Sequence, residues 1–354
     1  MLIRLPLALA AFALLPLSAS AGDAQTPAQV CADDGWKAVF PAAGAVCLAT
    51  RHGLVIASPS EAASLLSVID EAAVRFDRHF GSPRSTIAVV PGGSLSAAQI
   101  AWLGERGQRG FPWLSGEQRR ALIAPRIRAR IQEQRPEITG DALDMVVERA
   151  MASVLGQDSG TERGALAHEL GHLWFHATFE GSAETTSEGG TLRYGSSAPD
   201  WIDEMAAVLA ENDELTASRR AGLADLAAGS GDAGLYPLAE YLTMPHPVMT
   251  APNREQIVGQ PGSDGGSRVQ IVGRGDGDAM AGRRTMLRFY TQSRGFADYL
   301  IEETGDPRVF LSIARALSGG ERFDQWLARE GAARHLPTSV DALARDWEAW
   351  TRGR

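Results

Sequence analysis

The sequence predicts an α+β protein in which a small N-terminal sheet region precedes a mainly helical half. Stretches that suit β-strands are concentrated in residues 36–91, whereas helical periodicity dominates from residue 96 onwards. The 354 residues are 44% hydrophobic and 22% charged, which is the composition of an ordinary globular chain. We therefore expect an N-terminal α/β region at 22–157 and a mainly helical region at 158–354.

Three strands and one helix are expected early in the first of these regions. Residues 37–40 show a short alternation, residues 53–56 are an apolar run, and residues 85–91 (STIAVVP) form the strongest strand pattern. Between the last two, apolar residues recur with helical spacing over 58–80, and a serine at the start of that stretch suits the N-cap. These elements together predict the small sheet region.

The rest of the chain is predicted to be helical, with two loop-rich interruptions. Helices are expected over residues 96–155, with a break near Pro136, and over 160–179, 200–212 and 284–350. Residues 181–199 and 252–283 are rich in glycine and small polar residues and indicate loops, the second with room for one short strand at 269–272.

Residues 1–21 have the pattern of an export signal and are not expected to belong to the fold. Arg4 gives a positive start, residues 5–17 are apolar, and Ala19-Ser20-Ala21 has the small residues of a cleavage site. The apolar run is shorter than the roughly 20 residues required to cross a bilayer, and no later stretch is long and apolar enough. The sequence therefore predicts cleavage after Ala21 and a periplasmic or secreted protein without a stable membrane anchor.

The net charge of −9 argues against a general attraction to nucleic acid or to an anionic membrane surface. Arginines do cluster at 119–120 and 126–130, but these stretches lie in a predicted helix and suit a solvated face. We therefore expect no nucleic acid among the partners of this protein.

The two cysteines, Cys31 and Cys47, both follow the predicted signal. An exported chain meets oxidising conditions, in which thiols pair. Neither cysteine lies near a histidine-rich stretch, so a thiol metal ligand or nucleophile is not indicated. The sequence predicts a Cys31–Cys47 disulfide that fastens the N-terminal segment.

Residues 168–172, HELGH, contain two histidines one helical turn apart. Side chains at positions i and i+4 leave the same face of a helix with their Cβ atoms about 5–6 Å apart. Two imidazoles so placed, His168 and His172, can hold one tetrahedral zinc ion at about 2.0–2.1 Å. Glu169 follows the first histidine and lies within reach of a water molecule on that zinc, as a catalytic base must. The pattern therefore predicts one zinc ion per chain.

A catalytic zinc usually has three protein ligands, and His176 is too far along the helix, about 12 Å from His168, to be the third. The pattern HExxHxxGxxH would require a histidine where this chain has Thr178. Glu204, one turn into the helix expected at 200–212, is the preferred third ligand. The alternatives are Glu184, Glu188, Asp203 and Glu211. The last two more naturally point to solvent or hydrogen-bond a ligand histidine.

HELGH, followed in the next predicted helix by PDWIDEMAA, resembles the gluzincin (peptidase MA-like) zinc metallopeptidases. Their second helix commonly has the pattern W-L-x-E-G-x-A, whose glutamate is the third zinc ligand and here corresponds to Glu204. Met205 stands where glycine is usual. Residues 289–300 resemble a further helix of the family, so Tyr290 is either a donor to the oxyanion or a packed aromatic residue. The resemblance covers about residues 160–335 and implies a thermolysin-like zincin catalytic half.

These residues predict a zinc metallopeptidase, with a peptide or protein as its substrate and Glu169 as the base that takes the proton of the attacking water. Related aminopeptidases carry a G-x-M-E-N element, which this chain lacks, so an endopeptidase is expected. His246, between two prolines, is either a plain loop histidine, which is the preferred interpretation, or a residue that reaches the cleft. The alternatives are a non-catalytic zincin-like module that binds a peptide or envelope protein, and a metal-dependent hydrolase of a non-peptide substrate.

Overall fold

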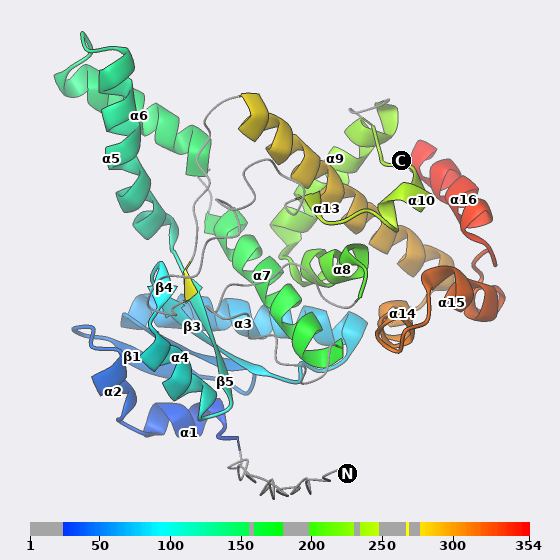
Figure 1. The fold of residues 1–354 in the computed structure, drawn as a ribbon, viewed down its shortest axis with the longest axis horizontal. Coiled ribbons are helices and arrows are strands. Elements are labelled where there is room, and N and C mark those ends of the chain that lie inside the picture. Colours follow the sequence, from blue (N-terminus) through cyan, green and yellow to red (C-terminus); the bar gives the residue numbers. More distant parts are fainter. Residues whose placement is uncertain (1–23, 156–158, 180–197, 230–233, 248–266, 269–276) are drawn as a thin grey trace, which may run out of the picture.

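The computed structural model describes residues 24–354 except 156–158, 180–197, 230–233, 248–266 and 269–276. It confirms the predicted α+β class, with a four-stranded sheet near the N-terminus followed by helices (Figure 1). Several predictions fall outside the described residues: the export signal with its cleavage after Ala21, nearly all of the loop at 181–199 with Glu184 and Glu188, and the strand at 269–272.

The sheet region precedes the helical region along the chain, as expected. The N-terminal region contains α1 (Pro27–Ala32), α2 (Trp36–Val39), β1 (Val46–Ala49), β2 (Gly53–Ala57), α3 (Pro59–Phe80), β3 (Thr86–Pro91), β4 (Ser94–Leu95), α4 (Ala97–Gly104), β5 (Gln108–Trp113), α5 (Gly116–Gln134) and α6 (Gly140–Leu155). The helical region contains α7 (Ser159–Phe179), α8 (Asp200–Ala210), α9 (Asp213–Ala228), α10 (Leu238–Tyr241), β6 (Ser267–Arg268), α13 (Gly277–Thr304), α14 (Val309–Ser318), α15 (Phe323–Glu330), η2 (Ala332–Arg334) and α16 (Val340–Arg352). The helices predicted at 58–80, 160–179 and 200–212 are confirmed as α3, α7 and α8.

The main sheet has the order β1-β2-β3-β5, with β1 and β2 antiparallel and the remaining pairs parallel. The long helices α3 and α7 cover one face, and the short helices α1, α2 and α4 cover the other. Along β2, Leu54 and Ile56 face the short helices, whereas Val55 lies on the other face, where α3 packs on this strand. Burial on both faces explains why this strand is apolar throughout.

One predicted strand is a helix instead. Residues 37–40 were expected to alternate as a strand, but α2 occupies Trp36–Val39. Trp36, Val39 and Phe40 all contact the same apolar cluster under the sheet. Their spacing of i, i+3 and i+4 is that of a helix with one apolar face, and the alternation was too short to outweigh it.

The strand β5 lies inside the stretch 96–155, which was predicted to be mostly helical. Glycine weakens a strand pattern, and Gly110 lies in the middle of this strand. The packing requires it, because a Cβ atom at Gly110 would lie 2.8 Å from the Leu95 side chain and 2.9 Å from that of Leu103. The parallel pairing with β3 therefore determines this strand more than its local sequence does.

The predicted disulfide between Cys31 and Cys47 is present and confirms the pairing. It fastens α1 to β1, and both cysteines pack against the apolar cluster between the sheet and the short helices. The bond joins residues 16 positions apart. A loop of about that length contributes about 3 kcal/mol when it is closed by a disulfide.

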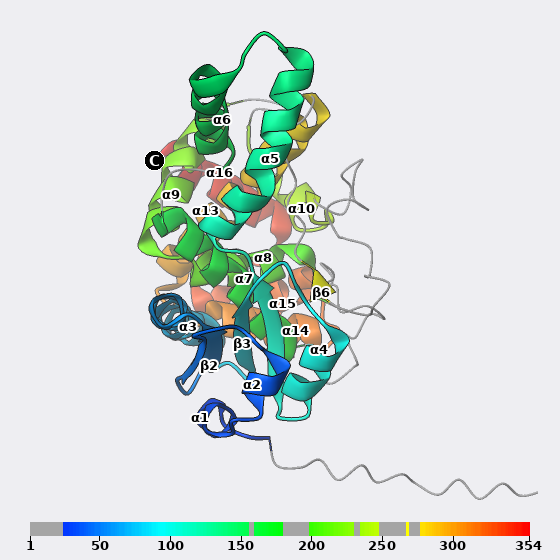
Figure 2. The same cartoon turned by 90° about the vertical axis from the view of Figure 1, so that its left-hand side faces the viewer.

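The helices α5 and α6 form a hairpin that projects from the rest of the molecule, as Figure 2 shows from the side. The break predicted near Pro136 lies between them. The hairpin has a small core of its own, made of Ile123, Leu143, Val147 and Met151. Its arginines lie on a solvated face, where Arg120 pairs with Glu148 and Arg128 pairs with Asp144.

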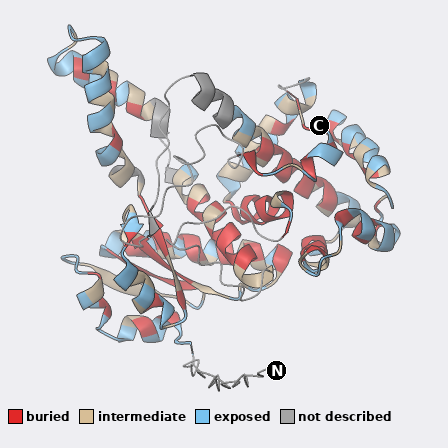
Figure 3. Ribbon diagram, viewed as in Figure 1, coloured by how far each residue is buried: buried red, intermediate tan, exposed pale blue. Residues whose placement is uncertain are grey.

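The largest core joins the sheet to the helical region. It contains strand residues such as Val89 together with large aromatic side chains of the helices, among them Trp174, Trp201 and Trp347. Figure 3 shows that burial is most continuous in α7, α8 and the strands, whereas α5 and α6 are largely exposed. The two helices that carry the predicted ligands are therefore at the centre of the molecule.

Candidate metal centre

The helices α7 and α8 lie closely against each other (Figure 1). Gly171, in the middle of HELGH, permits this approach. A Cβ atom at Gly171 would lie 2.7 Å from both the carbonyl oxygen of Ala206 and the Cα atom of Ala207. Small residues on both helices therefore bring the histidines of α7 within reach of the acids of α8.

His168 and His172 on α7 and Glu204 on α8 form one buried group whose ligand atoms all lie within 4.8 Å of one another. Glu204 is completely buried, and the two histidines are 6% and 5% exposed. Nε2 of His168 lies 3.5 Å from Oε1 of Glu204, and Nε2 of His172 lies 3.7 Å from Oε2. The structure thus brings the two motif histidines and the preferred glutamate together, and the group could bind a metal ion.

The distances between the histidine Nε2 atoms and the Glu204 oxygens suit the ligands of one metal ion. A charge-assisted hydrogen bond between an imidazole and a carboxylate is about 2.7–2.9 Å long. Two ligands that are each about 2.0–2.1 Å from a tetrahedral ion are about 3.3–3.4 Å apart. The nitrogen–oxygen distances of 3.5 and 3.7 Å are closer to the second value. The geometry and the donor chemistry therefore both fit a bound cation.

Buried carboxylates hold the Nδ1 atoms of both histidines. His168 Nδ1 donates to Glu211 and His172 Nδ1 donates to Asp203, each over 2.9 Å. A hydrogen bond at Nδ1 fixes the tautomer and directs Nε2 toward the metal position. Asp203 and Glu211 therefore support the histidines, as one alternative predicted, and Glu204 faces the Nε2 atoms. The other alternative, that these two acids point to solvent, is wrong, because both are buried.

Two further side chains complete this outer layer. His176 Nε2 lies 2.8 Å from the second oxygen of Asp203, so that carboxylate bridges His172 and His176. Arg219 of α9 donates two hydrogen bonds to Glu211, at 2.9 and 3.3 Å. His176 thus supports the site without entering it, as its distance along the helix predicts. The sequence analysis missed Arg219, whose only signal is its place on the helix that follows Glu211.

The carboxylates give the site a preference for positive charge. Burial opposes protonation of His172, but the charge and hydrogen bond of Asp203, with the charge of Glu204, raise the pKa of His172 to about 10. Burial also favours the neutral form of Glu204, but the charge of His168 and the approach of His246, whose Nε2 atom lies 3.3 Å from Oε2, hold the pKa of Glu204 below its usual range. A metal ion can take the place of a proton in such a site, because histidine ligands bind metals in their deprotonated form.

Glu169 differs from the other acids of the site. It is half-buried, and it makes no hydrogen bond or ion pair with any residue in the described part of the chain. Its charge nevertheless reaches the metal position, since it contributes to the raised pKa values of His172 and Tyr290. No described residue thus holds the Glu169 carboxylate, whereas Asp203 and Glu211 are engaged in hydrogen bonds with histidines.

Tyr290 of α13 packs against the first ligand histidine. Its ring centroid lies 5.2 Å from that of His168, and the Arg219 guanidinium lies 5.0 Å from the tyrosine ring. Burial and the charges of Glu204 and Glu169 raise the pKa of Tyr290 well above its ordinary value. The hydroxyl group of Tyr290 therefore keeps its proton and can serve as a hydrogen-bond donor beside the ligands.

Of the two interpretations of His246, the preferred one of a plain loop histidine is wrong, and the structure agrees with the alternative that it approaches the site. Its side chain is buried, and its Nε2 atom lies 3.3 Å from Oε2 of Glu204. Its ring lies 5.7 Å from the ring of Tyr290. The segment reaches the site because α10 before it is anchored to α13, through a 2.8 Å hydrogen bond from Tyr241 to Ser293. No local sequence pattern indicates the contact between His246 and Glu204, because the two residues are far apart in the sequence.

Comparisons of the chain with protein-family models, curated proteins and solved structures gave no match. None of the helices within the described ranges has the length and apolarity needed to cross a membrane. The resemblance to gluzincins therefore stays an expectation that HELGH and PDWIDEMAA carry. The function proposed below rests on the geometry of this site and on the chemistry of its residues.

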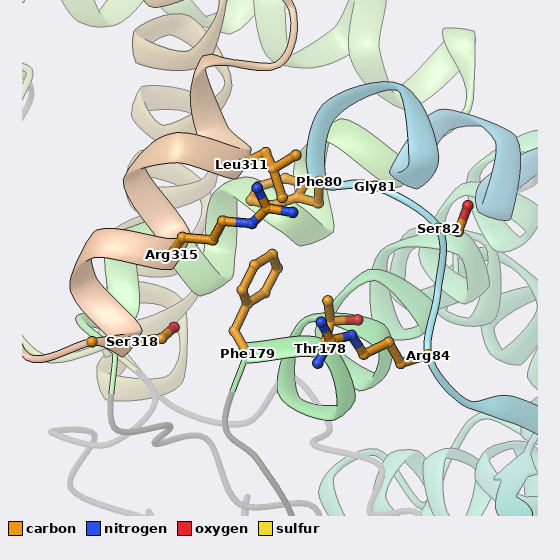
Figure 4. Close-up of a pocket in the computed structure, with 10 residues that line it drawn as sticks. Phe80, Gly81, Ser82, Arg84, Thr178, Phe179, Leu311, Arg315 and Ser318 are labelled. Atoms are coloured by element: carbon orange, nitrogen blue, oxygen red, sulfur yellow. The ribbon is translucent and has the colours of Figure 1, made fainter. Parts of the chain in front are cut away.

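A separate hollow of about 360 Å³ lies where α3, α7 and α14 end (Figure 4). Phe80, Phe179 and Leu311 form apolar walls, and Arg84 and Arg315 extend their guanidinium groups along it. The exposed carbonyl groups at helix C-termini favour nearby positive charge, which explains why arginines gather here. The residues of the metal centre do not line this hollow.

Proposed function

We propose that this protein is a zinc-dependent peptidase in which His168, His172 and Glu204 hold the metal. The observation that carries the proposal is the buried group that the HELGH motif of α7 forms with Glu204 of α8. Two imidazoles and one carboxylate, with further carboxylates behind the imidazoles, are typical of catalytic zinc sites that keep one position open. Calcium and magnesium prefer sites made of oxygen ligands, so zinc suits this donor set better.

Zinc supplies Lewis acidity, which makes water acidic enough to attack near neutral pH and polarises the carbonyl group under attack. Glu169, which no described residue engages in a hydrogen bond, takes the proton of the attacking water and passes it to the leaving amine. Tyr290 donates a hydrogen bond to the oxyanion from its protonated hydroxyl. Asp203 and Glu211, the latter held by Arg219, keep the imidazoles in orientation.

The proposed substrate is a peptide or protein that is cut at internal bonds outside the cytoplasm. An HExxH motif whose glutamate can act as a base favours peptide hydrolysis, since a purely structural zinc site would not need Glu169. The Cys31–Cys47 disulfide supports an oxidising compartment, and the export signal predicted at residues 1–21 agrees with it.

The proposal is tested by cleavage of an unfolded protein such as casein with zinc-loaded wild type and Glu169→Gln. Glu169→Gln should retain zinc, but its rate of casein cleavage should fall by about 10²- to 10⁴-fold, which is the usual contribution of general base catalysis. Glu162→Gln, on the same helix but paired with Arg119, is the matched control and should cleave as the wild type does. Normal cleavage by Glu169→Gln would refute the base assignment. Zinc-loaded wild type that cleaves no peptide bond would instead favour a binding module.

A further inference from the structure

His246 lies between Pro245 and Pro247 in the segment after α10. Its backbone N–H donates to the Asp200 carboxylate over 2.5 Å, which ties the segment to the first turn of α8. Its ring packs edge-on against Phe289 of α13, with the ring centroids 5.2 Å apart. Two helices that carry residues of the metal centre therefore fix the position of His246.

The imidazole of His246 approaches one oxygen of Glu204. Its Nε2 atom lies 3.3 Å from Oε2, which is closer than the Nε2 atoms of His168 and His172 lie to the same carboxylate, at 3.5 and 3.7 Å. The separation of 3.3 Å would also suit two ligands of one ion. His246 nevertheless lies outside the candidate ligand group, which consists of His168, His172 and Glu204 and whose ligand atoms all lie within 4.8 Å of one another. His246 therefore reaches Glu204 from beyond the ligand set.

A glutamate that binds a metal through one oxygen leaves its other oxygen to be satisfied by a donor. Glu204 is completely buried, and a buried acceptor left without a donor costs about 1–3 kcal/mol, or more when it is charged. We propose that His246 donates its Nε2–H to Oε2 of Glu204 and thereby holds this carboxylate in the orientation that completes the metal site. The inference rests on the metal site of the proposed function. His246 is a positioning residue that acts on the metal through Glu204.

Zinc affinity of the full chain tests this role, measured by competition with a chromogenic chelator and without substrate. His246→Ala removes the donor and should weaken zinc binding about 10- to 100-fold, as loss of an outer-layer partner usually does. His246→Gln places an amide N–H donor at a similar reach and should restore most of the affinity. His79→Gln is the matched control, because His79 is also buried but bonds to the carbonyl of Pro307, and it should leave zinc affinity unchanged.

Circular dichroism of the metal-free proteins establishes that each variant is folded. Wild-type affinity in His246→Ala would overturn the inference, as would an equal loss in His246→Ala and His246→Gln. Unchanged affinity together with lost peptide cleavage in His246→Ala would assign the residue to the substrate instead. If the wild type itself binds no zinc, the proposed function fails. If the wild type binds zinc and His246→Ala binds it equally, only the role of His246 fails.

Discussion

The pairs α7–α8 and α5–α6 both consist of packed helices, but they bury different kinds of residue. The first pair encloses histidines and ionised acids within the largest core of the protein. The second encloses a narrow apolar seam, and its charges pair at the surface, where such pairs contribute little. Buried charges require partners, and they are provided by Asp203 of α8, Glu211 at the end of α8 and Arg219 of α9. The metal centre therefore depends on the surrounding core, whereas the hairpin stands apart from it.

The largest expected effect comes from opening the core beside the site. Leu170 of α7 and Met151 of α6 are both fully buried. Leu170→Ala should lower the free energy of unfolding of the whole protein by about 2–5 kcal/mol and weaken zinc binding. Met151→Ala should lower the free energy of unfolding of the α5–α6 hairpin by a comparable amount. The rest of the protein should keep its stability, because α5 and α6 pack mainly on each other.

Native-state hydrogen exchange separates these two outcomes. In Met151→Ala, faster exchange should be confined to residues 116–155, with zinc affinity unchanged. In Leu170→Ala, it should extend through α7 and α8. If Met151→Ala exposed the amides of α7 equally, the hairpin and the metal centre would be one cooperative unit, and the contrast between them would be wrong.

Acid should weaken the core more than the hairpin, because His79 of α3 is buried in it. Burial lowers the pKa of His79 from 6.5 to about 4. The unfolded chain therefore takes up this proton at a higher pH than the folded chain does. The free energy of unfolding should fall as the pH falls from about 6.5 to 4, by about 3 kcal/mol in total from this group.

Urea unfolding at pH 7 and pH 4.5 checks this effect. His79→Gln should lose less stability between the two pH values than the wild type loses. His335→Asn, at an exposed position whose left-handed backbone asparagine tolerates, is the control and should behave as the wild type does. Equal losses in the wild type and His79→Gln would contradict a neutral buried His79.

A smaller effect is expected where the two site helices approach each other. Gly171→Ala places a Cβ atom against α8 and should cost about 1–3 kcal/mol through overpacking, while it also weakens zinc binding. Gly104→Ala in α4 meets no atom within 4 Å and should be neutral or stabilising by up to about 1 kcal/mol. Thermal unfolding and zinc affinity measured on both variants test this difference. Wild-type stability and affinity in Gly171→Ala would mean that α7 and α8 do not require the close approach.

The central residues of the site could be predicted because each lies in a short sequence motif within a single helix. His168 and His172 lie one turn apart on a single helix, and Glu204 occupies a recognisable position on the next one. The same holds for α3 and β3, whose periodicity is strong and uninterrupted. Cys31 and Cys47 left only one pairing within the chain.

The rest of the site depends on tertiary packing. The sequence allowed Asp203 and Glu211 to be ligands, to support a histidine or to point to solvent, and only the packing of α7 on α8 and α9 decides between these roles. His246 follows a segment without a clear hydrophobic periodicity, and its packing against α13 determines where its side chain lies. In the sheet, β5 depends on its partner β3, so its own sequence, interrupted by a glycine, favoured another structure.

Metal content tests the account most directly, measured by native mass spectrometry on the wild type beside Glu204→Ala. We expect one zinc ion per chain in the wild type and none in the variant, because His168 and His172 alone leave the ion without its third ligand. Folded wild type that takes up no zinc even from an excess, or Glu204→Ala that retains it fully, would contradict the proposed metal centre.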